Sequence, residues 1–409
     1  MGNTTAGRWS WGVEEELLSK QTLFARLEQG ATAINLAAFA IVVHSVMLSS
    51  ERLQAQPPIA FRELYSFKGG ADGGLPYASL IRDAAGNLNG TTVDSGAFNL
   101  GTVFQVDKNG NETVLHSFTG VDGANPHAVL FEDAAGNLYG TTANGGASGQ
   151  GTVFKLDKNA AETVLHSFTG ADGATPYAGL VRDAAGNLYG TTYNGGAFNL
   201  GTVFKLDVDG NETVLHSFSG TDGSNPYAGL IPDAVGNLYG TTAKGGASGE
   251  GTVFKLHKNA SETVLHSFTG TDGATPYGGL VRDAAGNLYG TTYDGGAFNL
   301  GTVFKLDNSG TETVLHSFAN KPDGAFPFTG VIQDGLGNLY GTTSLGGALH
   351  QGMVFELNEG GDYTVLHSFG GRDGKTPVGG LVRDRANNLF GATEGGGGFG
   401  YGTVFEITP

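Results

Sequence analysis

Cysteine is absent from this 409-residue chain, which excludes disulfide bonds, a thiol nucleophile and a cysteine-ligated metal. Basic residues are also few: 22 Lys and Arg stand against 39 Asp and Glu, giving a formal net charge of -17. Nucleic acids and anionic membrane surfaces are bound through basic patches, so we expect neither as a partner. After residue 60 the sequence has no sustained helical periodicity and no GxSxG, HExxH, P-loop or EF-hand motif.

A repeat dominates the rest of the chain: one pattern occurs seven times between residues 61 and 409, with a period of about 50 residues. Each unit holds four short runs rich in Val, Leu, Phe, Tyr and Thr, bounded by Gly, Asn, Asp and Pro clusters, which is typical of strands and tight turns. In one unit these runs cover 179–183, 187–192, 201–207 and 212–218. The 71 glycines fall at fixed places in the units, so they indicate turns and not low-complexity sequence.

Seven units of four strands predict an all-β fold, a seven-bladed β-propeller with one unit per blade. The ends of the repeat region are offset, since 61–67 matches the fourth strand of a unit and 402–408 matches the third. The last blade would lack its outer strand unless 61–67 paired with 402–408. We therefore expect a monomeric ring closed by both ends of the chain. An open solenoid is the alternative, although it gives no reason for the offset.

Residues 1–55 form a separate segment of different composition. A polar and charged start precedes an apolar run at 31–48, which we expect to be a hydrophobic helix. Small residues near Ala55 complete the pattern of a cleaved secretory signal. The run is also nearly long enough for a retained membrane anchor, and a cytosolic helix is a third option. The first two options place the propeller, 56–409, outside the cell or in the cell envelope, with membrane contact only through the N-terminal segment.

The repeat unit resembles the GloVer (Gloeo-Verruco) tandem repeat family, because LHSF, GNLYGTT and GTVF occur together in one unit and the likeness extends over 61–409. The resemblance implies an exported, β-propeller-like bacterial repeat protein. It implies no activity, since none is established for the family. Some members carry a C-terminal sorting segment, whereas this sequence ends directly after its last predicted strand, so we expect any anchoring to come from the N-terminus.

Several recurring residues have a structural interpretation beside a chemical one. The tyrosine of NLYG is expected in the blade core, and the glycine after it indicates close packing of neighbouring blades near the axis. An aspartate opens each hairpin turn between the first two strands, where it caps the turn or binds a metal. Histidines recur in the fourth strand, about one blade apart, so they cannot share an ion, and we expect packing or hydrogen-bonding roles. The turn aspartates are Asp83, Asp133, Asp183, Asp233, Asp283, Asp334 and Asp384; the histidines are His116, His166, His216, His266, His316 and His367.

Two loops of each unit are predicted to emerge at the same end of the ring, where the binding residues of scaffolded folds concentrate. One links the second and third strands, and the other follows the fourth strand and contains an Asp-Gly pair. Its aspartate either caps the turn or belongs to a ring of carboxylates around the mouth, which would bind calcium or a polar ligand. The ring would comprise Asp72, Asp122, Asp172, Asp222, Asp272, Asp323 and Asp373.

Four arginines precede the hairpin turn, near the opposite mouth of the predicted channel. They either pair with an anion there or contact solvent and neighbouring aspartates. They are Arg82, Arg182, Arg282 and Arg383.

Near-identical units argue against catalysis, because an active site needs unlike groups in one place. We therefore expect a non-catalytic binding or structural module at the cell envelope, without a cofactor unless calcium binds, and with a cell-surface protein or glycan as partner. The alternative is a lyase or hydrolase acting on an extracellular polymer, with its site at the loop mouth around the atypical sixth and seventh units. An intracellular scaffold is a third possibility.

Overall fold

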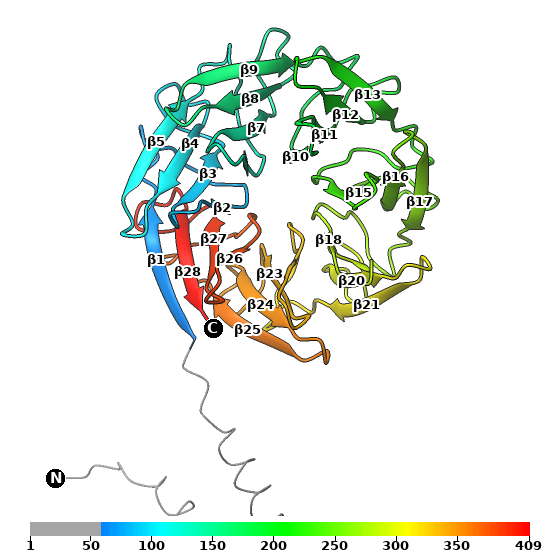
Figure 1. Cartoon of the computed structure of the whole chain (residues 1–409). Coiled ribbons are helices and arrows are strands. Elements are labelled where there is room, and N and C mark those ends of the chain that lie inside the picture. Colours follow the sequence, from blue (N-terminus) through cyan, green and yellow to red (C-terminus); the bar gives the residue numbers. More distant parts are fainter. Residues whose placement is uncertain (1–58) are drawn as a thin grey trace, which may run out of the picture. The chain divides into compact units, whose positions relative to one another are not determined.

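The computed structural model describes residues 59–409, which form 28 strands in seven four-stranded sheets. The sheets are arranged as blades around a central axis (Figure 1). The predicted all-β, seven-bladed propeller is therefore confirmed. Within 59–409, no helix is long and apolar enough to cross a membrane. The expected N-terminal helix, and the segment 1–55 as a whole, lie outside the described residues.

In the first six blades, four consecutive strands run from the axis outward, as Figure 1 shows. Blades one to three comprise β2 (Ile81–Arg82), β3 (Leu88–Thr92), β4 (Thr102–Val106) and β5 (Glu112–Ser117); β6 (Phe131–Glu132), β7 (Leu138–Thr142), β8 (Thr152–Leu156) and β9 (Glu162–Ser167); β10 (Val181–Arg182), β11 (Leu188–Thr192), β12 (Thr202–Leu206) and β13 (Glu212–Ser217). Blades four to six comprise β14 (Ile231–Pro232), β15 (Leu238–Thr242), β16 (Thr252–Leu256) and β17 (Glu262–Ser267); β18 (Val281–Arg282), β19 (Leu288–Thr292), β20 (Thr302–Leu306) and β21 (Glu312–Ser317); β22 (Ile332–Gln333), β23 (Leu339–Thr343), β24 (Met353–Leu357) and β25 (Tyr363–Ser368).

The seventh blade is built from both ends of the repeat region, as predicted. It contains β26 (Val382–Arg383), β27 (Leu389–Thr393) and β28 (Thr403–Thr408), and its outer strand is β1 (Ala60–Ser66). Strands β1 and β28 pair antiparallel, with Phe61 opposite Ile407. An ion pair of 2.9 Å joins Arg62 to Glu406 across the two strands. Residues more than 300 positions apart thus close the ring.

The hydrophobic core lies between adjacent blades. In β12, Val203 and Phe204 are both fully buried, although neighbouring residues of a strand point to opposite faces. Both faces are buried because each blade is covered by a neighbour on either side. Phe168, which follows the outer strand of the second blade, meets Phe204 of the third edge to face, with 5.1 Å between ring centroids. The same aromatic pairing recurs at other interfaces, as in Phe118–Phe154, Phe218–Phe254, Phe268–Phe304 and Phe369–Phe405.

The glycine inside the second strand of each blade is required by a different contact from the one expected. A Cβ atom built on Gly190 would lie 2.7 Å from the ring of Phe204 and 3.0 Å from the side chain of Leu180. Both residues belong to the same blade as Gly190. The expectation of close packing between neighbouring blades is therefore wrong at this position: the glycine makes room for an aromatic ring of its own sheet.

The hairpin aspartates organise the turns between the first and second strands. The Asp183 carboxylate accepts hydrogen bonds from the backbone N–H groups of Ala185 and Asn187, from the Asn187 side chain and from the Tyr189 hydroxyl. Burial raises the pKa of Asp183, but these hydrogen bonds outweigh it and hold the pKa below its usual value. Gly186 of the same turn has a φ of 94°, which favours glycine. The turn-forming interpretation of these aspartates is confirmed.

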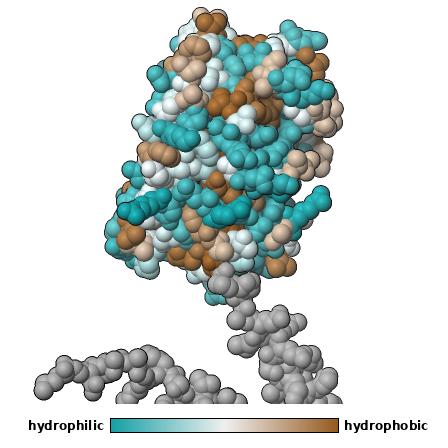
Figure 2. Space-filling view, turned by 90° about the vertical axis from the view of Figure 1, so that its left-hand side faces the viewer, coloured by the Kyte–Doolittle hydropathy of each residue, from teal (hydrophilic) through white to brown (hydrophobic). Residues whose placement is uncertain are grey.

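The outer strands form the perimeter of the ring. In β5, Thr113 is exposed while the other five residues are partly buried. The loop that follows β5 and contains the Asp122-Gly123 pair, and its equivalent in each blade, is called the DG loop; it contacts the strand through Asp122 and His116. Figure 2 views this perimeter beside β1 and β5, where hydrophilic residues predominate and apolar patches are separated from one another.

Candidate functional site

The two loops expected at one end of the ring do meet there. The loop between β7 and β8 and the loop between β5 and β6 are joined by backbone hydrogen bonds, with Gly146 N donating to Gly120 O at 2.9 Å. Ala124 and Asn144 of the same loops form an antiparallel bridge. Equivalent bridges recur in the other blades, so the loops form a hydrogen-bonded rim on this face.

The carboxylates of the DG loops point to the outermost strands of their own blades. Asp122 Oδ2 lies 2.9 Å from His116 Nε2 of β5, and Asp122 Oδ1 accepts from the backbone N–H of Thr119 at 2.8 Å. The same contacts hold Asp172, Asp222, Asp272, Asp323 and Asp373 against His166, His216, His266, His316 and His367, while Asp72 accepts from Tyr65. The structure therefore does not gather these side chains around the channel, because each is held by its own loop and strand. The hydrogen-bonding role expected for the six histidines is observed. Calcium binding by the aspartates stays a prediction.

Three of the four arginines lie against aromatic rings of the preceding blade. The Arg182 guanidinium is 5.9 Å from the Tyr139 ring centroid, and its Nη1 atom is 3.8 Å from Asp133. Arg282 lies over Tyr239 and Arg82 over Phe390 in the same way. Arg383 instead donates to Asn387 of its own turn. The contacts of Arg82, Arg182 and Arg282 link blades, whereas that of Arg383 does not. Pairing with an external anion stays a prediction.

A ring of aromatic side chains lines the central channel at the end where the loops emerge. The segment that leads into each innermost strand begins with a proline, and the residue after this proline faces the axis. These residues are Tyr77, His127, Tyr177, Tyr227, Tyr277, Phe328 and Val378, and together with the small residues that follow them they line a cavity of about 270 Å³.

Neighbouring members of this aromatic ring touch one another. Tyr177 and Tyr227 stack with their centroids 4.8 Å apart, and His127 meets Tyr77 and Tyr177 edge to face at 4.8 and 5.0 Å. Phe328 of the sixth blade contacts Tyr227 of the fourth at 5.4 Å, as it does Tyr77 of the first. Since these contacts skip intervening blades, the aromatic side chains crowd the axis itself.

Burial disfavours the charged forms of the ionisable groups at this mouth. Burial raises the pKa of Tyr77 to about 12, and it lowers the pKa of His127 to about 4. Glu394 occupies the position that Tyr193 has in the third blade, and burial raises its pKa while Lys375 opposes the rise. The carboxylate of Glu394 in turn contributes to the raised pKa of Tyr77. The mouth therefore presents apolar faces, hydroxyl donors and one partly buried carboxyl group.

Sequence reasoning missed this aromatic ring. The signal was present, because the residue after the proline is tyrosine, phenylalanine or histidine in six of the seven units. The sequence does not give the distance of that segment from the axis, because this distance follows only from the blade geometry.

Comparisons with known proteins support the fold. The family model for the Gloeobacter/Verrucomicrobia repeat matches residues 54–243, 160–348 and 231–409. No curated protein matches the chain. Among solved structures, virginiamycin B lyase from Staphylococcus aureus is similar with a TM-score of 0.62 and 13% identity, covering 86% of this chain and 99% of its own.

Two further solved structures are more distant. The extracellular domain of a protein described as a one component system from B. thetaiotaomicron has a TM-score of 0.57 and 11% identity, covering 84% of this chain and 39% of its own. A gluconolactonase from Xanthomonas campestris has a TM-score of 0.45 and 17% identity, covering 71% of this chain and 88% of its own. At these identities the likeness to the lyase and to the extracellular domain shows the fold alone.

Proposed function

The chain belongs to the Gloeobacter/Verrucomicrobia repeat family, and we propose that it is a non-catalytic binding module of the cell envelope that takes a glycan at the aromatic mouth of its channel. The observation that carries this proposal is the convergence of six aromatic or histidine side chains on the axis. Ligand sites are concave and mostly apolar, with a few polar groups that fix orientation. Tyrosine offers a flat apolar face and a hydroxyl, which suits the C–H face and the hydroxyl groups of a sugar ring.

The repetition of the blades supports binding over catalysis. The units that contain Tyr177 and Tyr277 supply the same groups to the axis, whereas catalysis requires a base, a nucleophile and a charge-stabilising donor in distinct positions. A histidine with a pKa of about 4, such as His127, is a weak base at neutral pH. A repeated aromatic surface gives a polymer several equivalent places to bind.

A glycan array probed with the full chain tests the proposal, followed by calorimetric titration of a glycan that binds. We expect Tyr177→Ala to weaken binding about tenfold, which corresponds to about 1.4 kcal/mol, and Tyr177→Phe to retain most of the affinity because the ring remains. Phe198→Ala is the matched control, since Phe198 is an aromatic residue of the β11–β12 loop that is 59% exposed and lies outside the channel lining. Equal affinity in all three variants, or an array without binding, would refute the proposal.

An enzyme acting on an extracellular polymer is the second candidate, and Glu394 is the observation that favours it. This carboxyl group stands in the seventh blade where other blades have tyrosine or small residues, and burial raises its pKa, as suits a general acid. Incubation of the full chain with the bound polysaccharide, followed by assay of new reducing ends and unsaturated products, decides between the candidates. Product formation that Glu394→Gln abolishes would establish the enzyme.

Export is the remaining part of the proposal, and it rests on the sequence of 1–55. Cell fractionation with N-terminal sequencing of the mature chain tests it. A cleaved N-terminus near Ala55 in the extracellular or envelope fraction is expected, and a soluble uncleaved chain in the cytosol would contradict export.

A further inference from the structure

At four interfaces between adjacent blades, a histidine, an aspartate and a glutamate occupy equivalent positions near the perimeter. The histidine belongs to the outer strand of one blade, the aspartate to the DG loop that follows it, and the glutamate is the first residue of the next outer strand. The four sets are His116, Asp122 and Glu162; His166, Asp172 and Glu212; His216, Asp222 and Glu262; and His266, Asp272 and Glu312.

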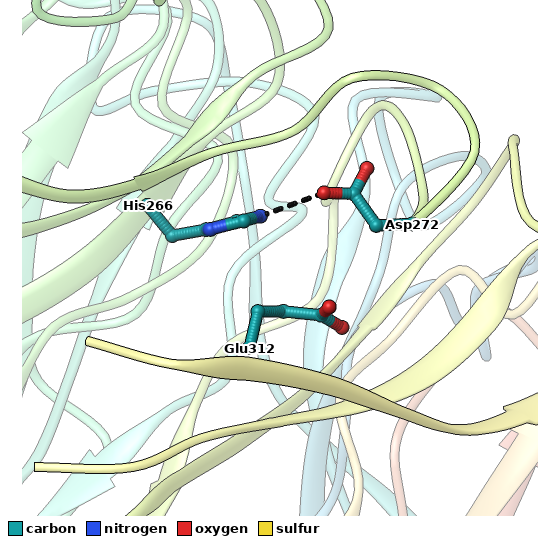
Figure 3. A group of neighbouring side chains, drawn as sticks. All are labelled: His266, Asp272 and Glu312. Atoms are coloured by element: carbon teal, nitrogen blue, oxygen red, sulfur yellow. Dashed lines mark hydrogen bonds and ion pairs between the residues drawn. The ribbon is translucent and has the colours of Figure 1, made fainter. Parts of the chain in front are cut away.

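Among the described residues, the set at the interface of the fourth and fifth blades is the one whose three ligand atoms lie close enough together to share an ion. His266 Nε2 and Asp272 Oδ2 are 3.0 Å apart, and one oxygen of Glu312 lies with them so that all three atoms are within 4.8 Å of one another. Figure 3 shows the imidazole and the Asp272 carboxylate pointing at each other, with the Glu312 carboxylate beside them. The His266 and Asp272 side chains are each 18% exposed, so water still reaches the cluster.

The glutamate of each set lacks a compensating partner. Its Oε1 atom is buried and has no hydrogen-bond partner, and this holds for Glu162, Glu212, Glu262 and Glu312 alike. Burial, followed by the repulsion of Asp272, raises the pKa of Glu312 to about 7. A buried carboxylate that faces a second carboxylate is unfavourable unless a proton or a cation neutralises it.

At two of the three interfaces with incomplete sets, an aromatic residue replaces the glutamate. Tyr363 replaces the glutamate next to His316, stacks on the imidazole at 4.2 Å and donates its hydroxyl to Asp323 O. Phe61 stacks on His367 at 4.0 Å in the same manner.

The third incomplete set replaces the histidine instead. Tyr65 takes the place of that histidine next to Glu112, whose Oε1 atom is also buried without a hydrogen-bond partner. Burial, followed by the repulsion of Asp72, raises the pKa of Glu112 to about 7, although Lys68 opposes the rise. Glu112 therefore shares the unpartnered oxygen and the raised pKa of the other four glutamates, and its set differs from theirs by the missing histidine and the nearby Lys68.

We propose that each of the four complete sets binds one first-row divalent cation of the zinc type, through the histidine Nε2 atom and one oxygen from each carboxylate. One imidazole with two carboxylates is a donor set that suits Zn²⁺, whereas Ca²⁺ takes six to eight oxygen ligands. Two carboxylates and a neutral imidazole balance a charge of +2.

Bonds of about 2.0 to 2.2 Å require ligand atoms a little over 3 Å apart, so rotation of the glutamate side chain completes the set. The fourth position is left to water. Such an ion would join the outer strands of adjacent blades around the perimeter.

The test uses the untagged full chain, freed of metal with a chelator and then dialysed against ZnCl₂, with CaCl₂ and MgCl₂ in parallel. We expect four zinc ions per chain by elemental analysis, a higher melting temperature with Zn²⁺ and no uptake of Ca²⁺ at these sites. The decisive variant carries Glu→Gln at 162, 212, 262 and 312 together, which preserves size and removes charge. Glu112→Gln is the matched control, because its set lacks the histidine.

The proposal is supported if the fourfold variant loses the bound zinc and the Glu112→Gln control keeps it. Less than one ion per chain, or the same zinc content in both variants, overturns it and assigns any uptake to other surface groups such as His257. Loading with Co²⁺ provides a second measurement on the folded protein. The visible absorption of four-coordinate Co²⁺ is expected in the parent chain and in the Glu112→Gln control, and its presence at equal intensity in the fourfold variant would also overturn the proposal.

Discussion

The stability of the propeller should depend on pH through His127, the histidine of the aromatic ring. Its imidazole takes the position that tyrosine has in four other blades, between the rings of Tyr77 and Tyr177. Its Nδ1 atom is buried without a hydrogen-bond partner. Burial therefore disfavours the charged form and lowers the pKa of His127 from 6.5 to about 4.

The sign follows from which state binds the proton. Between pH 6.5 and pH 4 the unfolded chain protonates this histidine while the folded chain keeps it neutral, so the free energy of unfolding decreases as the pH falls through this window. The contribution of His127 is complete above pH 6.5 and lost progressively below it. The difference between a pKa of 6.5 and one of about 4 amounts to about 3 kcal/mol.

The assay compares urea unfolding of the parent chain and of His127→Tyr from pH 8 to pH 4. Tyrosine restores the residue of the neighbouring blades and does not titrate in this range. The other histidines and the carboxyl groups contribute to both proteins, so the difference between the two profiles isolates His127. We expect the parent to lose about 3 kcal/mol more than the variant between pH 8 and pH 4. Parallel profiles would show that the imidazole is solvated and would refute the burial argument.

Substitutions at four further positions test the packing and the turns, each by thermal and urea unfolding. Phe67→Ala should cost about 3 to 5 kcal/mol because the ring is fully buried. Arg62→Ala should cost less than about 1 kcal/mol because the arginine side chain of its ion pair is 59% exposed. Equal effects of the two substitutions would show that the ion pair closes the ring. Gly190→Ala should destabilise by about 1 to 3 kcal/mol, since the new methyl group would lie 2.7 Å from the Phe204 ring, and a neutral result would mean that the core has room to spare. Asp183→Ala should cost about 1 to 3 kcal/mol by leaving the turn N–H groups unpaired, while Asp183→Asn should recover part of the loss.

The fold could be predicted from the sequence because its determinants are local and repeated. Turn residues such as Asp183 and Gly186 fix each hairpin, so the order of strands within a blade follows from their order in the chain. Because 61–67 matches a fourth strand and 402–408 matches a third strand, the two segments complete one blade by pairing with each other, which closes the ring. The role of Gly190 was assigned to the wrong neighbour, because the pattern marks a close approach but not the residue that approaches.

The site could be predicted less well, since it depends on where each segment lies relative to the axis. The aspartates of the DG loops were placed on the correct face, but their side chains turn outward to the histidines, a direction that sequence spacing does not encode. Glu312 and Asp272 are 40 residues apart and meet only when two blades are in register. Tyr177 and Phe328 belong to different blades and share the axis for the same reason.

Closure of the ring by β1 and β28 is the central claim, and a cross-link tests it most directly. Arg62 and Glu406 are opposite one another in the β1–β28 register, and antiparallel partners have Cα atoms about 4.5 to 5.5 Å apart, within the range of a disulfide. The chain has no cysteine, so the double variant Arg62→Cys/Glu406→Cys has no competing thiol. Mass spectrometry after mild oxidation should find one intramolecular disulfide linking the two ends in nearly every molecule. Free thiols, or links only between chains, would contradict the closed ring.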